Sequence, residues 1–487
     1  MNLLLKFLLL ALCYSLPFGK GWGLASFAQN PEVKRTYHWY FGEKAGLDFS
    51  NNNVVKDVSS QMNTVEGCAT ISDTCGNLLF YSNGDTVWNY NHQIVLNGTG
   101  LMGCFSSSQA VAIVPQPLND SLFYIFTTDC IENNGVNGLR YSVININGNS
   151  GNGEIILKNQ LLYQPCSEKM AVTHHSNEID YWIVSHELNS SRFFSYQLSS
   201  TGISPPVISV EGVNIGVYGW GELKISPNGV KIATHYNLIS DIDTLELYDF
   251  NNTNGIISNA ISLPMDTLDE AFGLSFSPNN NVLYIATLNA NGDLLTQLWQ
   301  FDVSSNNQTI IQNSRIEIFN SMNHWLYGMQ LGADGRIYVA KEGTQFADSI
   351  GVINFPNQLG SACSFSLNEY DFSGYKLSVG LPNFPNSYFN NTSWLPNCSV
   401  DISELNTLAK LIMYPIPSNN YLIIESESYM DFSNIKITDI QGKNIPVKIF
   451  SQNQNSIVLD ITNLSNSLYF LIINNQNLSF THKFLKL

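Results

Sequence analysis

The sequence predicts an all-β protein, a β-propeller followed by a small C-terminal β-sandwich. The clearest unit is 221–250, in which two apolar strands flank the turn Pro227–Asn228–Gly229 and a third apolar run ends at Phe250. This pattern indicates an antiparallel hairpin with one further strand. It recurs at intervals of 41 to 60 residues, with starts near Gly67, Ser108, Glu168, Gly221, Phe272 and Tyr327. Such periods, with about four strands each, are typical of propeller blades.

The two ends of the repeat region predict one further blade. Trp39–Phe49 and Val54–Ser59 fit the third and fourth strand positions of a blade, and Leu377–Phe389 contains a candidate inner strand. If both ends contribute to one blade, the ring closes and few strand edges remain exposed. Six repeats and this composite blade give seven blades, with six to eight allowed.

Composition restricts the class of partner. The chain has 487 residues, of which 44% are hydrophobic and 13% charged, and its net charge is −17. Residues 408–487 are close to neutral, so the negative charge belongs to the body. An acidic body repels phosphate backbones, and we therefore expect no nucleic-acid partner.

The N-terminus has the pattern of an export signal. A short start with one cation precedes the mostly apolar run Phe7–Phe18, and Ser26 and Ala28 supply small residues for cleavage. We expect residues 1–28 to be a signal peptide that is cleaved after Ala28. The apolar run is too short for a membrane span, and no later segment is predicted to be transmembrane. Export permits disulfides, and the seven mature cysteines predict one to three of them and at least one buried thiol.

The repeat pattern ends before the last hundred residues. We predict a propeller over 37–391, a linker over 392–407 and a separate module over 408–487. The module has about seven short strands in about 80 residues, which is typical of a small β-sandwich.

This module contains four stretches in a characteristic order: YPIPSNNYLIIES, IKITDIQGKNI, IVLDITNLSNSLYFLII and THKFLK. Over 411–487 it resembles the type A sorting domain of the type IX secretion system of Bacteroidota, although Ile416 and Ser467 depart from the family pattern. The resemblance implies Sec export, the type IX secretion machinery as a partner, and a secreted or outer-membrane surface location. The residues that carry the motif are Tyr414, Pro415, Pro417, Gly442, Lys443, Tyr469, Lys483 and Lys486.

The body also resembles a known group. The stretches WYFGEKAGLDF, DYWIVSHE, LKISPNG and VGLPNF are similar to those of secreted WD-repeat-like propellers that accompany such sorting domains. The Trp-Asp ends of true WD repeats are missing. The resemblance implies no catalytic activity, because the group has none to carry over.

Aromatic residues near the inner strands are the candidate ligand site. Trp220 and Trp325 each stand just before an inner strand, and with Trp39, Trp88 and Tyr218 they would form an aromatic ring at one mouth of the channel. Glu66 precedes the first inner strand and would reach the same channel. Aromatic platforms suit sugars and peptides. Packing between blades is the competing interpretation, and for Glu66 we favour a hydrogen bond between blades.

Other candidates are weaker. Glu66 and Asp85 would be a carboxylate pair for acid–base hydrolysis, but a turn-capping role for Asp85 is simpler. His174 and His175 point to opposite faces of a strand, so they and His186 favour strand-end hydrogen bonds over a metal. The sequence lacks nucleophile-elbow, dinucleotide and P-loop motifs. We therefore assign no catalytic residue, metal or cofactor.

We expect a binding protein that recognises an extracellular protein or glycan. Two alternatives stay open: a glycan-active hydrolase or lyase with channel-facing carboxylates, and a structural component of the cell envelope or of gliding or adhesion machinery. Two carboxylates about 5–10 Å apart in an open pocket would favour hydrolysis. An aromatic mouth without them would favour binding.

Overall fold

A computed structural model gives the fold, and the chain divides into two compact units, 1–398 and 399–487. The structure describes residues 31–51, 53–236, 243–265, 269–289, 295–343, 348–390, 411–415, 418–426, 432, 435–439, 443–453, 455–475 and 478–486. The predicted signal peptide with Ala28 lies outside these residues, as do the whole linker 392–407, Pro417 and Gly442.

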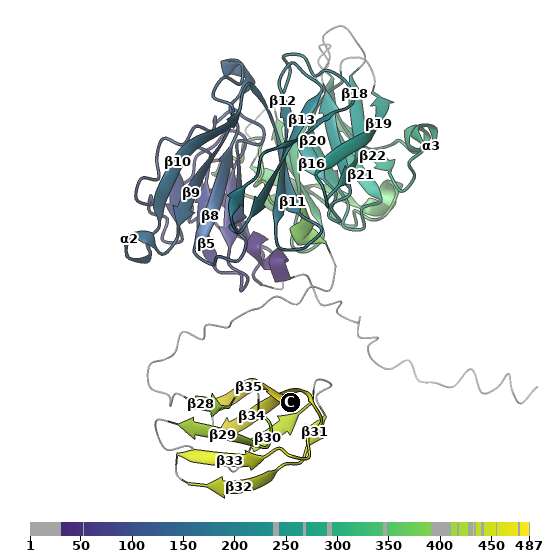
Figure 1. Ribbon diagram of the computed structural model, residues 1–487. Helices are drawn as coiled ribbons and strands as arrows, with labels where there is room; N and C mark the ends of the chain where they lie inside the picture. Colours follow the sequence, from purple (N-terminus) through teal and green to yellow (C-terminus); the bar gives the residue numbers. More distant parts are fainter. Residues whose placement is uncertain are drawn as a thin grey trace, which may run out of the picture. The chain divides into compact units, whose positions relative to one another are not determined.

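The described residues of the first unit form seven antiparallel sheets, which matches the predicted seven blades (Figure 1). Each of the six sequence repeats forms one sheet. The inner strands β4, β7, β11, β16, β20 and β24 contact one another in this order. The strands of the first three repeats are β4 (Ala69–Ser72), β5 (Leu78–Ser82), β6 (Val87–Asn89), β7 (Val111–Pro115), β8 (Leu122–Thr127), β9 (Leu139–Asn145), β10 (Glu154–Tyr163), β11 (Cys166–His174), β12 (Tyr181–Glu187), β13 (Arg192–Ser199), β14 (Gly202–Ile203) and β15 (Val207–Val210).

The last three repeats each form a four-stranded sheet in sequential order. Their strands are β16 (Leu223–Ile225), β17 (Lys231–Tyr236), β18 (Thr244–Asn251), β19 (Ile256–Pro264), β20 (Asp269–Phe276), β21 (Val282–Asn289), β22 (Thr296–Asp302), β23 (Ile316–Ser321), β24 (His324–Leu331), β25 (Ile337–Gly343), β26 (Ser349–Ile353) and β27 (Phe365–Asp371). Short helices connect or flank these sheets: η1 (Pro31–Thr36), η2 (Ile131–Asn133), α2 (Gly148–Gly151), α3 (Gln308–Asn313), η3 (Gly360–Cys363) and η4 (Asn386–Phe389).

The turn in 221–250 forms for the local reasons that the sequence indicates. Gly229 has φ +73°, a left-handed conformation that glycine adopts without a steric cost, and its N–H donates to the Ser226 carbonyl at 2.7 Å. β16 and β17 then pair with Leu223 opposite Thr234. Alternate side chains enter the cores on the two faces of the blade, and β19 completes it as the outer strand.

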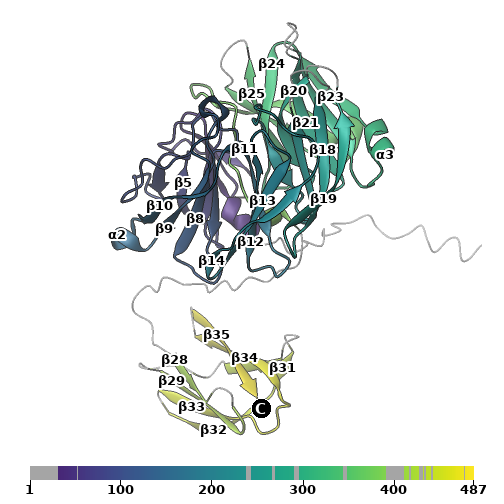
Figure 2. The ribbon, with the colours of Figure 1, turned by 45° about the horizontal axis from the view of Figure 1, so that its top comes forward.

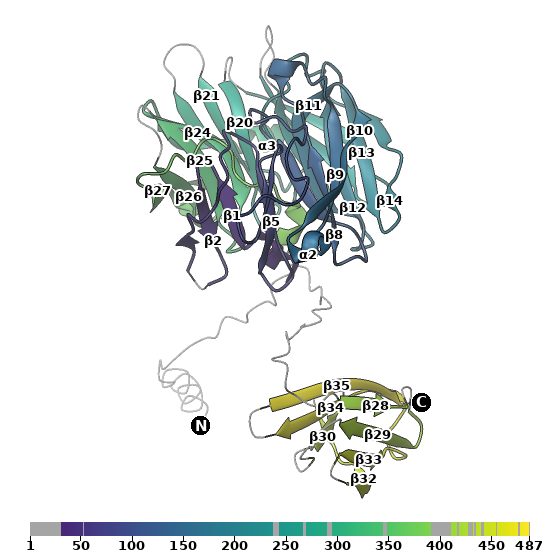
Figure 3. The same ribbon diagram turned by 90° about the vertical axis from the view of Figure 1, so that its left-hand side faces the viewer.

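Segments from both ends of the first unit close the ring. The N-terminal sheet contains β1 (His38–Phe41), β2 (Ala45–Asp48) and β3 (Val55–Lys56), and Figure 3 shows it beside the β24–β27 sheet. On its inner side, the Val379 N–H donates to the Val65 carbonyl at 3.1 Å, and the Gly328 N–H donates to the Val379 carbonyl at 3.0 Å. Segment 376–384 therefore lies between the first and last inner strands.

The N-terminal contribution differs from the prediction in one respect. Trp39–Phe49 was expected to fill one strand position, but it contains the two strands β1 and β2. The chain reverses between them at Gly42 and Lys44, which have φ +56° and +61°. A Gly-Glu-Lys turn is a weak signal, because Glu and Lys are not typical turn residues.

Helices η1 and η4 cover one end of the channel. In Figures 1 and 2 the purple turn of η1 lies at this end among the inner strands. The Asn386 side-chain amide donates to the carbonyl of Ile225, the last residue of β16, and the Ser387 hydroxyl accepts from the N–H of His174, the last residue of β11. Both contacts lie at the C-terminal ends of inner strands.

The second unit is a sandwich of two four-stranded sheets, with the orders β28-β29-β33-β32 and β31-β30-β34-β35. Its core contains buried residues from both sheets, among them Leu422, Ile457, Leu471 and Phe484. The strands are β28 (Leu411–Tyr414), β29 (Tyr421–Ser426), β30 (Ile435–Thr438), β31 (Asn444–Ile445), β32 (Lys448–Gln452), β33 (Ser456–Asp460), β34 (Ser467–Asn475) and β35 (Leu478–Lys486).

Candidate functional site

The end of the channel opposite η1 and η4 carries half-buried aromatic rings. Each of these aromatic residues lies just before an inner strand or near the beginning of one. Tyr218 and Trp220 form an edge-to-face pair with centroids 4.8 Å apart, and Phe272 and Tyr327 form another at 5.4 Å. Trp325 is also half-buried. We call the surface that these five residues define the aromatic face.

Backbone contacts narrow the channel at the aromatic face. The Glu222 N–H donates to the Phe272 carbonyl at 3.0 Å, and the Gly67 N–H donates to the Ser107 carbonyl at 3.0 Å. A Cβ atom at Gly273 would lie 1.9 Å from the Tyr327 carbonyl oxygen, so only glycine permits this approach. The inner strands therefore begin in a tight ring, and the aromatic residues stand beside it.

Glu66 lies in this ring beside a second carboxyl group. Glu168 is 1% exposed, and its carboxylate accepts from the N–H and hydroxyl of Ser108 at 2.9 and 2.8 Å and from the Ile131 N–H at 3.0 Å. Burial raises the pKa of Glu168 to about 7. Burial, and then repulsion from Glu168, raise the pKa of Glu66 to about 9, so Glu66 is protonated at neutral pH.

Polar side chains fill the channel below this ring. The Gln109 amide oxygen accepts from the N–H groups of Met170 and Leu223 at 2.9 and 2.8 Å, which connects the sheets of the second, third and fourth repeats. The Glu222 carboxylate forms an ion pair with Lys224 at 3.2 Å. Lys169 is fully buried, and burial lowers its pKa to about 7. The interior is a packed polar core, with its carboxylates held by backbone and lysine groups.

Two predicted mouth residues lie elsewhere. Trp39 is fully buried on β1, where its indole N–H donates to the Thr36 carbonyl at 2.8 Å and its ring contacts Tyr338. Trp88 is on β6, the third strand from the channel, and stacks on Tyr81. Glu66, Tyr218, Trp220 and Trp325 do stand at inner-strand starts. The six predicted residues do not line the three pockets described below.

The histidines form the predicted strand-end hydrogen bonds. His174 Nδ1 bonds the Ser387 hydroxyl at 2.9 Å, His175 Nε2 bonds the Thr253 carbonyl at 3.0 Å, and His186 Nδ1 bonds the Glu187 carbonyl at 2.8 Å. Burial lowers the pKa of His174 and of His186 to about 3, so both are neutral. His174 and His175 also line a polar pocket of about 340 Å³ at the η4 end.

Cys104 and Cys130 form a disulfide, and Cys68, Cys166 and Cys363 are buried thiols, as the cysteine count predicts. Asp129 lies beside the disulfide, within 4.8 Å of both sulfurs. These three side chains have a spacing that would suit a metal. Because the two sulfurs are bonded to each other, they are not thiolate ligands here.

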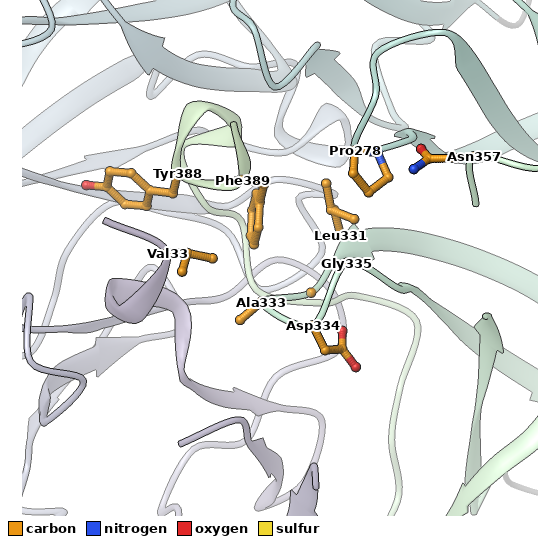
Figure 4. A pocket seen from close by; sticks show the side chains of 10 residues that line it. Val33, Pro278, Leu331, Ala333, Asp334, Gly335, Asn357, Tyr388 and Phe389 are labelled. Carbon is orange, nitrogen blue, oxygen red and sulfur yellow. The ribbon is translucent and has the colours of Figure 1, made fainter. Parts of the chain in front are cut away.

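Two adjoining pockets open at the η1 and η4 end, and they share Ala333 and Asp334. The pocket in Figure 4 has a volume of about 330 Å³ and lies between Val33 of η1, Tyr388 and Phe389 of η4, and the turn after β24. The second, of about 610 Å³, lies over β1–β3 and is lined by Tyr37, Phe49, Asn51, Asn53, Asp334, Arg336 and Tyr370, among others. No sequence pattern indicates these pockets, because they join segments about 300 residues apart.

The sorting-motif residues occupy ordinary sandwich positions. Tyr469 is buried, donates its hydroxyl hydrogen to the Ser465 carbonyl at 3.0 Å and stacks on Phe484. Lys443 N–H donates to Asp439 in a turn, and Lys483 and Lys486 are on β35, the latter buried. Tyr414 ends β28 and precedes Pro415. Together the two units define the class: an all-β propeller joined to a secretion sorting module.

Comparison with known proteins agrees with this class. Residues 412–486 match the family model of the secretion system C-terminal sorting domain, so this module directs export. No curated protein matches the chain. Within the described residues, no helix has the length and apolar character to cross a membrane.

Solved structures similar to the chain are distant. Hydrazine synthase of Kuenenia stuttgartiensis is 10% identical with TM-score 0.38, covering 68% of this chain and 80% of that one. A quinoprotein alcohol dehydrogenase-like protein of Bacteroides thetaiotaomicron is 10% identical with TM-score 0.38, covering 66% and 73%. A periplasmic gluconolactonase of Pseudomonas aeruginosa is 10% identical with TM-score 0.36, covering 75% and 99%.

Proposed function

We propose that this chain is an extracellular binding protein, exported by the type IX secretion system, whose aromatic face recognises a protein or glycan outside the cell. The observation that carries the proposal is the asymmetry of the channel. One end is covered by η1 and η4, and the other presents five half-buried aromatic rings. Four exposed apolar side chains also precede inner strands in the chain: Val65, Phe105, Val217 and Met322.

The shape of the aromatic face favours a macromolecule. Exposed apolar side chains that cluster around aromatic anchors are typical of binding surfaces on soluble proteins. The three pockets described above all lie at the other end. We infer that a ligand of the aromatic face contacts several of its rings at once, as a protein or a polysaccharide does. These features, with the sequence resemblance, also support kinship with the secreted WD-repeat-like propellers of Bacteroidota.

An array of extracellular-matrix peptides and glycans, probed with the mature protein, tests this proposal. We expect a ligand whose binding is weakened at least tenfold by Trp220→Ala, a loss of about 1.4 kcal/mol or more. Trp325→Ala should act in the same direction, and Tyr90→Ala is the matched control because Tyr90 is 50% exposed on another part of the first repeat. Binding that is insensitive to both tryptophan variants would refute the assignment of the aromatic face.

A hydrolase is the second candidate, and Glu66 is the observation that favours it. A carboxyl group with a pKa of about 9 beside another carboxyl group resembles a general acid. Glu168, however, is 1% exposed and its carboxylate already accepts three hydrogen bonds from the protein, so a water or sugar has no access to it. A glycosidase and lyase screen, run on the wild type and Glu66→Gln, separates the two functions. Turnover that Glu66→Gln abolishes would replace the binding proposal.

Export has its own test. We expect the secreted protein to begin at Gln29, after cleavage at Ala28, as N-terminal sequencing would show. Deletion of 408–487 should leave the propeller in the periplasm, because the sorting module is then absent. Secretion of the truncated chain at the normal level would contradict the role of the module.

A further inference from the structure

The 610 Å³ pocket at the η1 and η4 end is a preorganised polar site that is separate from the aromatic face. Tyr37 and Phe49 border it from the N-terminal sheet, and Asp334, Arg336 and Tyr370 border it from the β24–β27 sheet. Its volume is in the range of small-molecule sites. We refer to it as the Tyr370 groove.

Arg336 fixes the polar groups of the Tyr370 groove. Its guanidinium donates to Asp334 Oδ2 at 2.6 Å, to the Tyr338 hydroxyl at 3.0 Å, to the Tyr370 hydroxyl at 2.6 Å and to Asn354 Oδ1 at 3.3 Å. The Tyr338 hydroxyl in turn donates to Asp334 Oδ2 at 2.9 Å. The donors of Arg336 and Tyr338 therefore point within the protein, and these side chains are held before any ligand arrives.

Beyond the internally bonded Arg336 and Tyr338 donors, the groove still offers hydrogen-bonding groups to a ligand. The carboxylate of Asp334 is 26% exposed and retains acceptor capacity. The Tyr370 oxygen accepts from Arg336, and among the described residues its own O–H has no acceptor. Asn51 and Asn53 are exposed at the rim and add amide donors and acceptors. Tyr37 and Tyr370 add partly exposed aromatic rings, which suit the C–H faces of sugars.

The charges of the groove select against anions. Arg336 is neutralised by Asp334 at 2.6 Å, with Glu369 3.7 Å away on the other side. No cation in the lining is free to pair with an acidic ligand, and the chain as a whole has a net charge of −17. An anionic ligand would meet repulsion without compensation.

We propose that the Tyr370 groove binds a neutral saccharide chain. The Asp334 carboxylate accepts hydrogen bonds from sugar hydroxyls, the Tyr370 hydroxyl and the asparagine amides bond the same sugar units, and the tyrosine rings pack on their apolar faces. This site is distinct from the aromatic face, and it would let the protein hold a glycan at one end and another ligand at the opposite end.

Titration calorimetry of the mature full-length protein tests the proposal. The probes are four neutral hexasaccharides, cellohexaose, laminarihexaose, xylohexaose and mannohexaose, and one anionic probe, hexagalacturonate. We expect at least one neutral probe to bind below about 1 mM. Tyr370→Ala and Asn53→Ala should each weaken this binding, Tyr370→Ala by tenfold or more. Asn53 is exposed in a loop, so its variant reports on binding even if Tyr370→Ala fails to fold.

The controls separate this site from the aromatic face. Trp220→Ala and Tyr90→Ala should leave the affinity for the hexasaccharide unchanged. If Trp220→Ala alone abolished binding of the hexasaccharide, the saccharide site would be at the aromatic face and the proposal would be overturned. It would also be overturned if no neutral probe bound, if only hexagalacturonate bound, or if binding survived both groove variants.

Discussion

Glu66→Gln should remove a large part of the alkaline instability of the propeller. Glu66 lies next to Glu168, and its buried Oε2 atom has no hydrogen-bond partner within the described residues. Burial and this neighbour raise the pKa of Glu66 from 4.5 to about 9. Glutamine has nearly the same shape and stays neutral, so it keeps the contacts of the protonated acid at every pH.

The sign and size follow from proton linkage. A carboxyl group with a raised pKa stabilises the fold fully below pH 4.5, and that stability is lost as the pH rises through the range up to 9. Between pH 5 and pH 8 the unfolded chain releases the proton and the folded chain keeps it. Each pH unit changes the unfolding free energy by about 1.4 kcal/mol per proton. Between pH 5 and pH 8, Glu66 therefore lowers the unfolding free energy by at most about 4 kcal/mol. The difference between wild type and variant cancels the contributions of other groups, such as Lys169.

Urea unfolding at pH 5 and pH 8, followed by tryptophan fluorescence, measures this difference. Residues 411–487 contain no tryptophan, so the signal reports on the propeller. We expect Glu66→Gln to be more stable than wild type at pH 8 by at least about 2 kcal/mol, and to differ much less at pH 5. Glu43→Gln, an exposed glutamate on the N-terminal sheet, is the matched control. If wild type and Glu66→Gln lost the same unfolding free energy between pH 5 and pH 8, the raised pKa of Glu66 would be refuted.

Two further predictions concern stability alone. The Cys104→Ser/Cys130→Ser double variant should lose about 3.5 kcal/mol of unfolding free energy, because the disulfide spans 26 residues and restricts the unfolded chain; urea unfolding that matches the wild type would contradict this. Gly273→Ala should cost about 3 kcal/mol, because its Cβ would clash with the Tyr327 carbonyl, whereas Gly351→Ala, whose Cβ would lie 3.2 Å from the Phe365 ring and 3.4 Å from the Ser366 carbonyl oxygen, should cost less than about 1 kcal/mol. Equal melting temperatures for these two variants would refute the tight ring of inner strands.

Much of the fold was predictable because the signals are local. Alternation of apolar and polar residues and turn residues such as Asn228 and Gly229 act within a few positions, and they place β16 to β19 close to where the structure has them. The same holds for β29, β33 and β34 in the sorting module. The turn at Gly42–Lys44 and the short strands β31 and β32 were missed, because their residues carry weak turn or strand preferences.

The candidate site was predictable only in part. Trp39 and Trp220 look alike in the sequence, each near a glycine and other aromatic residues. Trp39 is buried because β1 packs against Tyr338 and Phe384, which are about 300 residues away. Trp220 stays partly exposed because it stands where an inner strand begins at the channel. An aromatic residue reaches the aromatic face when it stands at or just before the start of an inner strand. Trp88 is on β6, the third strand of its sheet, and therefore does not reach this face.

The sequence by itself determined the all-β class, the blade repeat, the composite closure and the sorting module, since these depend on local periodicity and on short motifs. The tertiary structure decided which end of the channel η1 and η4 cover, that Glu66 and Glu168 share Ser108, and that Asp334 and Tyr370 meet the N-terminal sheet in one groove. These features depend on the closure of the ring, which brings distant segments together and buries charges between them. A pKa or a binding surface depends on burial and on neighbouring charges. Both are set by residues that are distant in the sequence, so local sequence patterns do not reveal them.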